Sequence, residues 1–162
     1  ILSVVFSFYF LFLPSVYDES IEIQNIARVG SVFGFLASIC FAGVAYTPAD
    51  LFIDAHIFFA DWLFRLMNLT IVFYAITYIM MKKNYFIFSF IFGIVALVVT
   101  AHIVLSDFGL ARFFYEPHTV RVLSQKAATI ALIISVPLMT IYNQKRLSSH
   151  PIDLRIFALK NY

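Results

Sequence analysis

The chain carries, from Leu51 to Met80, the stretch LFIDAHIFFADWLFRLMNLTIVFYAITYIM, which is long and apolar enough to cross a bilayer as one helix. Three ionisable residues nevertheless lie inside it: Asp54, Asp61 and Arg65. At about 100° per helical residue they fall, together with Asn68, within roughly 60° of one another. One face of this expected membrane helix is therefore polar, and charged groups inside lipid are rare and commonly functional.

The composition also indicates a membrane protein. Hydrophobic residues make up 62% of the 162 residues, charged residues only 12%, and the mean hydropathy is +0.93. A soluble domain has about half apolar and about a quarter charged residues, so this balance excludes an ordinary soluble domain. The formal net charge is +2 and the basic residues form no long run, so we expect no nucleic-acid partner. Cys40 is the single cysteine, which excludes a disulfide framework and a cysteine metal site.

Apolar stretches of spanning length recur along the chain and predict an all-α fold, an integral membrane helical bundle with five transmembrane helices. Pro14 and the acidic residues after it end the first stretch, and the turn Thr47–Asp50 separates the second from the third. Pro137 is expected to kink the last span. The expected spans are residues 1–16, 26–47, 51–80, 85–106 and 119–142, followed by a polar and basic tail over residues 143–162.

Basic residues predict the orientation of these spans. If Lys82 and Lys83 face the cytoplasm, the basic residues of the tail face it too, because two spans separate the two groups. Arg112 and Arg121 then remain at the outer ends of the helices. We therefore expect a cytoplasmic C-terminus and an outward first residue, which suggests a sixth span upstream of Ile1.

Small residues share one face of the second expected span. Because small side chains let two helix backbones approach closely, we expect this face to pack on another helix. The residues concerned are Ala27, Ser31, Gly34, Ser38 and Ala42.

Residues 34–64 read GFLASICFAGVAYTPADLFIDAHIFFADWLF, a small-residue helix followed by a Pro-Asp turn and an apolar helix with an early histidine. This pattern resembles a six-helix membrane family that comprises the damage-regulated autophagy modulators, the glycosylphosphatidylinositol-remodelling proteins and their uncharacterised bacterial and archaeal relatives. A polar pair before the last span is similar to the family's amphipathic entry into its final helix. The resemblance implies that the chain corresponds to the last five of six helices, and it implies architecture more than activity. The positions that carry it are Gly34, Gly43, Pro48, Asp50 and His56, with Gln125 and Lys126 as the polar pair.

Polar side chains of three spans are expected at a similar depth. Arg65 lies near the middle of the third span, Asp61 about 7 Å further out, and Lys126 of the fifth span at about the depth of Asp61. A lone charge at that depth costs about 3 kcal/mol, so these groups should turn inward and pair, Asp61 with Arg65 for example. We therefore predict a polar cavity in the outer half of the bundle, lined by Asp54, Asp61, Arg65, His102, Gln125 and Lys126.

Three functions fit this pattern. The favoured hypothesis is a non-enzymatic subunit or scaffold of a membrane complex, whose charges hold its helices in register and whose partners are the lipid bilayer and other membrane proteins. The first alternative is a ligand or proton pathway through the polar cavity, and the second is a lipid-modifying membrane enzyme. We assign no catalytic residue, because the chain has no GxSxG motif and no phosphate-binding glycine loop.

We expect neither a metal nor a cofactor. His56 projects about 180° from the Asp/Arg face of its helix, so it cannot share a ligand shell with Asp61. A haem between His56 and His102 would lack the usual paired histidines on each of two helices. A zinc-dependent lipid hydrolase would lack an HxxxH or HExxH pair.

Overall fold

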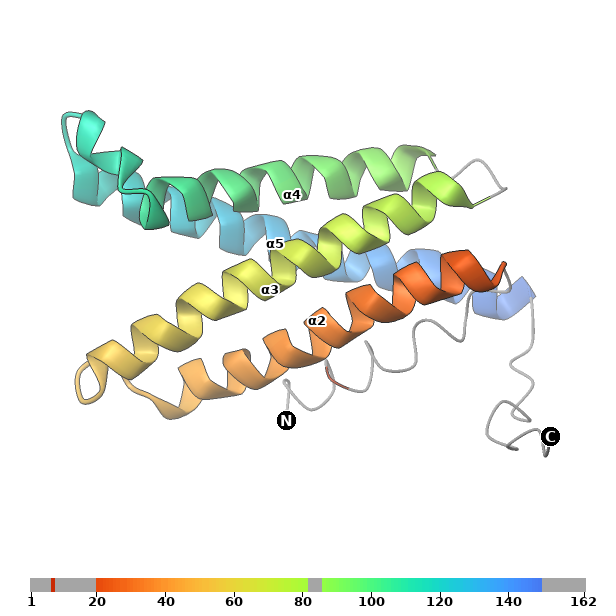
Figure 1. The fold of residues 1–162 in the computed structure, drawn as a ribbon, viewed down its shortest axis with the longest axis horizontal. Helices are drawn as coiled ribbons and strands as arrows, with labels where there is room; N and C mark the ends of the chain where they lie inside the picture. The colour runs from red at the N-terminus through yellow and green to blue at the C-terminus, as the bar shows by residue number, and fades with distance from the viewer. Residues whose placement is uncertain (1–6, 8–19, 82–85, 150–162) are drawn as a thin grey trace.

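The computed structural model describes Ser7, residues 20–81 and residues 86–149. These residues form four long helices and one short 3-10 helix, and they contain no strand (Figure 1). The long helices are α2 (Ile21–Tyr46), α3 (Ile53–Met80), α4 (Phe86–Asp107) and α5 (Pro117–Ser149), and the 3-10 helix η2 (Leu110–Phe113) lies between α4 and α5.

All four long helices are long and apolar enough to cross a membrane, α5 through its part Pro117–Leu138. They indicate an all-helical integral membrane bundle, with four candidate spans in the described part of the chain. The expected first span, residues 1–16, lies outside the described residues apart from Ser7. A bundle of five spans is therefore not confirmed.

Two helices extend past their expected ends. α2 begins at Ile21 rather than at residue 26, because no helix breaker separates these positions and Glu22 lies in the first turn, where the helix dipole favours an acidic side chain. α5 continues to Ser149 rather than ending at residue 142. The residues after 142 are polar, yet they include no Gly or Pro before Pro151 that would stop the helix.

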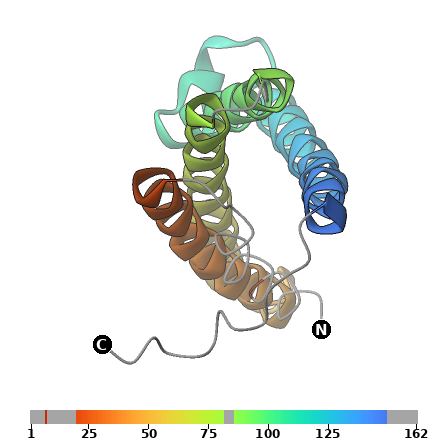
Figure 2. The same ribbon diagram turned by 90° about the vertical axis from the view of Figure 1, so that its right-hand side faces the viewer.

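The four helices form an open arc in which each packs on the next along the chain. α2 contacts α3, α3 contacts α4, and α4 contacts α5, with α2 and α5 at the two ends of the arc (Figure 2). The turn at residues 47–52 and η2 lie at one end of the bundle, which we call the η2 end (Figure 1). Gly109 allows the sharp turn into η2, since its φ of 63° is in the left-handed region that glycine tolerates.

Aromatic side chains and internal hydrogen bonds fill the seams of the arc. The rings of Tyr78 on α3 and Phe92 on α4 are stacked, with centroids 5.5 Å apart. The hydroxyl oxygens of Tyr74 and Ser31 lie 2.6 Å apart and join α3 to α2. The Ser89 hydroxyl donates to the carbonyl oxygen of Ala75 at 3.0 Å and joins α4 to α3. Such bonds satisfy polar groups that hydrocarbon cannot solvate.

The seam between α2 and α3 is built on small residues. Of the expected packing face, Ala27, Ser31, Gly34 and Ser38 are buried and Ala42 is half-buried. Two glycines allow α2 to approach α3 closely. A Cβ atom at Gly43 would overlap the Phe59 ring, and a Cβ atom at Gly30 would lie 3.0 Å from the Cβ atom of Phe73 and 3.6 Å from the carbonyl oxygen of Thr70.

We predict that Gly30→Leu destabilises the protein by about 1–3 kcal/mol, because the new side chain would push α2 away from α3. Gly93→Leu is the matched control, since a Cβ atom at Gly93 would meet nothing within 4 Å. Thermal unfolding in detergent should show a lowered midpoint for Gly30→Leu only. Equal midpoints for the two variants would contradict the close approach of α2 and α3.

Candidate functional site

An ion pair joins α3 to α4 at the η2 end. Arg65 contacts Asp107 Oδ2 through Nη2 at 2.8 Å and through Nε at 2.9 Å, with 33% and 26% of the two side chains exposed. The Trp62 ring also lies beside the guanidinium, with its centroid 5.3 Å from the Arg65 carbon Cζ. Asp107 is the last residue of α4, where the helix dipole disfavours an isolated carboxylate, so a cation at this position relieves an unfavourable charge.

This pairing differs from the one expected from the sequence, in which Arg65 would pair with Asp61 one turn away on the same helix. Three contacts between α3 and α4 explain the difference: Ala75 with Ser89, Asn68 with Thr100 and Arg65 with Asp107. These pairs lie progressively further from the last residue of α3 and from the first residue of α4, as in antiparallel helices. The register of the hairpin thus brings the end of α4 to Arg65.

His102 lies at the centre of a second polar group, between α4 and α5. Its side chain is buried, its ring meets that of Phe64 edge to face at 4.7 Å between centroids, and its Nδ1 lies 3.0 Å from Ser124 Oγ. The Ser124 hydroxyl donates to the carbonyl oxygen of Arg121 at 2.9 Å. The contact between His102 and Ser124 joins α4 to α5.

Asp61 completes the polar surface of α3. It is half-buried and lies within electrostatic range of the His102 ring, as does Asp107. Asn68, one turn beyond Arg65, donates from Nδ2 to the Thr100 hydroxyl at 2.9 Å. Its Oδ1 is the one buried side-chain oxygen or nitrogen in the described residues without a hydrogen-bond partner.

The six side chains expected to line one polar cavity lie in different surroundings. Arg65 pairs with Asp107, His102 bonds to Ser124, and Asp61 lies within electrostatic range of His102. The side chains of the other three are exposed: Asp54, Gln125 and Lys126.

Two residues of these interhelical polar contacts, Asp107 and Ser124, were not predicted from the sequence. Asp107 was assigned to the loop after the fourth span, and a serine near a helix start carries no signal of its own. The rule that an intramembrane cation needs an acid on a neighbouring helix, applied with the hairpin register, would have found Asp107.

His56 bonds through Nδ1 to the carbonyl oxygen of Thr47 at 2.6 Å, which ties the start of α3 to the end of α2.

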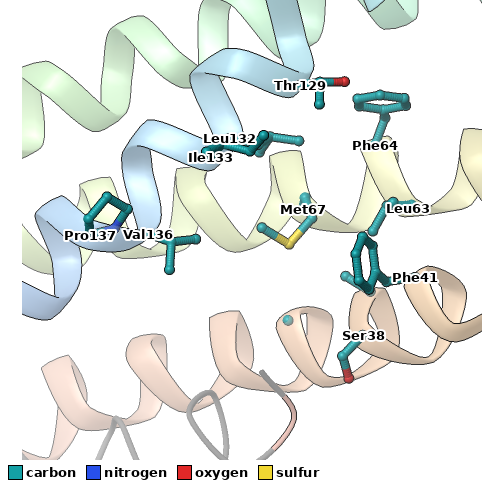
Figure 3. A pocket seen from close by; sticks show the side chains of 12 residues that line it. Ser38, Phe41, Leu63, Phe64, Met67, Thr129, Leu132, Ile133, Val136 and Pro137 are labelled. Carbon is teal, nitrogen blue, oxygen red and sulfur yellow. The ribbon is translucent and has the colours of Figure 1, made fainter. Parts of the chain in front are cut away.

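An apolar groove lies on the concave side of the arc, away from the Arg65–Asp107 pair. It has a volume of about 440 Å³ and is bounded by α2, α3 and α5. Figure 3 shows side chains from all three helices around a common space, with Met67 of α3 near its middle. The lining is predominantly apolar and includes Ser38, Phe41, Leu63, Met67, Ile133 and Val136.

No three side chains of the His, Cys, Asp and Glu types gather at metal-binding distance within residues 20–81 and 86–149. Comparisons with known proteins found no matching family model, no matching curated protein and no matching solved structure. The resemblance to the six-helix family therefore stays a prediction.

We predict that Arg65 and Asp107 are energetically coupled by about 0.5–1.5 kcal/mol, the range for polar contacts between membrane helices. Arg65→Met and Asp107→Leu should each destabilise the protein by leaving one charge unpaired, and the double variant should lose less than the sum of the two. Unfolding in detergent measures all four proteins of the cycle. Lys126→Met is the control, because Lys126 is an exposed cation. Strictly additive effects of the Arg65 and Asp107 changes would contradict the pairing.

Proposed function

We propose that this protein is a non-enzymatic scaffold or subunit of a larger membrane complex. The observation that carries the proposal is the use of its intramembrane polar groups: each interhelical polar contact described above joins one helix to the next along the chain. These contacts are Ser31 with Tyr74, Ala75 with Ser89, Asn68 with Thr100, Arg65 with Asp107, and His102 with Ser124.

Such contacts support a structural role because most of the polar atoms involved are occupied, with Asn68 Oδ1 as the exception. A proton or ligand pathway needs groups that can exchange partners along a continuous polar route. Here Arg65 makes two contacts to one carboxylate oxygen, and His102 is fixed by Ser124 on one side and Phe64 on another. The polar groups then serve to hold the shape of the arc.

The outer surfaces of the arc support the second half of the proposal, a role in a complex. Large apolar side chains are exposed on every long helix, for example Val32 on α2, Ile79 on α3, Leu97 on α4 and Leu123 on α5. In a membrane these surfaces contact either lipid or the helices of another protein. An open arc offers such a partner two end helices, α2 and α5, that each have only one packed neighbour among α2–α5.

The double variant Arg65→Met/Asp107→Leu tests this function against the pathway alternative. Matched apolar replacement of an ion pair keeps a bundle folded, so a scaffold should keep most of its thermal stability and the size of the complex extracted in mild detergent. The purified protein in vesicles should carry no proton flux above that of protein-free vesicles. A flux in the natural protein that disappears in the folded double variant would contradict the scaffold and favour the pathway.

We further propose that the C-terminal end of α5 faces the cytoplasm, since Lys145 and Arg146 follow its apolar part while Lys82 and Lys83 lie in the α3–α4 connection. The η2 end then faces outward. Labelling of intact cells with an impermeant maleimide checks this in a Cys40→Ser background. Glu116→Cys at the η2 end should react, and labelling of Gln144→Cys instead would reverse the orientation.

A further inference from the structure

The apolar groove between α2, α3 and α5 is too large to be an ordinary packing defect. Interiors of proteins contain few voids larger than a water molecule, whereas this groove holds about 440 Å³. Its α5 wall runs from Thr129 to Pro137 (Figure 3), which is about 12 Å along the helix axis. This wall lies within the apolar part of α5, so the groove opens into the interior of the bilayer.

The two hydroxyl groups of the groove lining already have hydrogen-bond partners. Ser38 donates to the carbonyl oxygen of Phe35 at 2.6 Å and also meets the hydroxyl of Ser7, and Thr129 donates to the carbonyl oxygen of Gln125 at 2.9 Å. The remaining lining side chains are apolar. Water or a polar ligand would find few partners here, since a bound water needs several polar neighbours. The lining therefore suits the hydrocarbon of an acyl chain.

Two polar side chains continue the groove face of α5 toward the η2 end. Lys126 precedes the groove residues Thr129 and Ile133 by three and seven positions. Gln125 precedes Thr129 and Leu132 by four and seven positions. Residues at these spacings share one face of a helix, and both polar side chains are exposed. One face of α5 thus presents a cation and an amide beside an apolar groove.

Lys126 needs an anion from outside the described part of the chain. It lies about 14 Å along α5 from Pro117, within the apolar part of the helix, where an unpaired charge is costly. It takes part in no ion pair within residues 20–81 and 86–149, because Arg65–Asp107 is the one ion pair there. The long lysine stem lets the ammonium group rise toward the lipid headgroups. A lipid phosphate can supply the missing anion.

We propose that the groove binds an anionic glycerophospholipid from the leaflet at the η2 end. One acyl chain lies along the groove, and the phosphate accepts hydrogen bonds from the Lys126 ammonium and the Gln125 amide. Charge complementarity favours a lipid over a helix of another protein, since such a helix would need an acidic side chain at the depth of Lys126, and acids are rare there. The inference does not depend on the scaffold function, because a pathway protein or an enzyme could hold a lipid in the same way.

Native mass spectrometry of the full chain in mild detergent tests the headgroup contact, with phosphatidylglycerol and phosphatidylcholine as the added lipids. Phosphatidylglycerol should bind more tightly, and Lys126→Gln should weaken its binding about tenfold, the order expected for one charge-assisted hydrogen bond. Arg112→Gln is the matched control, because Arg112 is an exposed cation of η2 that does not lie on the groove face. Equal losses in the two variants would show unspecific attraction to anionic lipid and overturn the site.

A substitution that fills the groove tests the position of the acyl chain. Ile133→Trp should weaken phosphatidylglycerol binding several-fold, because Ile133 lines the groove. Ile134→Trp, at the next and also exposed position of α5, should leave binding unchanged. Equal binding by the two variants would place the chain elsewhere and overturn docking in the groove.

The same spectra distinguish the other occupants, since they report the mass of the protein with everything bound to it. A dimer that takes up no phosphatidylglycerol would assign the groove to a second copy of the chain. A monomer that binds neither lipid, or binds both equally, would also overturn the proposal.

Discussion

Hydrocarbon offers no hydrogen bonds, so every polar group that enters a bilayer has to find its partner within the protein. This constraint explains the main contacts of the bundle. Arg65 and Asp107 neutralise each other between α3 and α4, and His102 and Ser124 satisfy each other between α4 and α5. Serine and threonine hydroxyls elsewhere donate to carbonyl oxygens of their own helices, as Thr70 does to Leu66 and Thr77 to Phe73.

The same constraint shapes the arc. Contacts between consecutive helices form wherever two antiparallel neighbours present polar or small residues at matching depth, and they leave α2 and α5 apart. Gly30 and the buried face around it bring α2 close to α3, whereas the groove between α2 and α5 is lined by side chains that make no such polar contact between the two helices.

Much of the fold could be predicted from the sequence, because apolar stretches of spanning length are a strong signal and prolines or acidic residues interrupt them. The ends of α2 and α5 were less predictable, since polar residues such as Gln24 and Gln144 continue a helix beyond the apolar part as readily as they begin a loop. The partner of Arg65 could not be read from local spacing. Asp107 is 42 residues away, and the two meet only when the α3–α4 hairpin has its final register.

The polar stripe on α3 shows what the periodicity of a single helix cannot predict. The periodicity of Asp54, Asp61 and Arg65 places them on one face, but it does not say which part of that face meets α4. Arg65 meets α4, Asp61 lies within electrostatic range of His102, and Asp54 is exposed near the start of α3. A charge close to a helix end can reach water at the membrane surface, so it needs no partner within the bundle.

The pairing of Arg65 with Asp107 inside a bilayer is the central claim, and solid-state NMR in lipid vesicles tests it most directly. The measurement is the dipolar coupling between guanidinium ¹⁵N and carboxylate ¹³C nuclei in protein labelled at arginine and aspartate. A contact of 2.8 Å between Nη2 and Oδ2 predicts a strong coupling in the natural protein that is lost in Arg65→Lys. A spectrum with no coupling that depends on Arg65 would contradict the account.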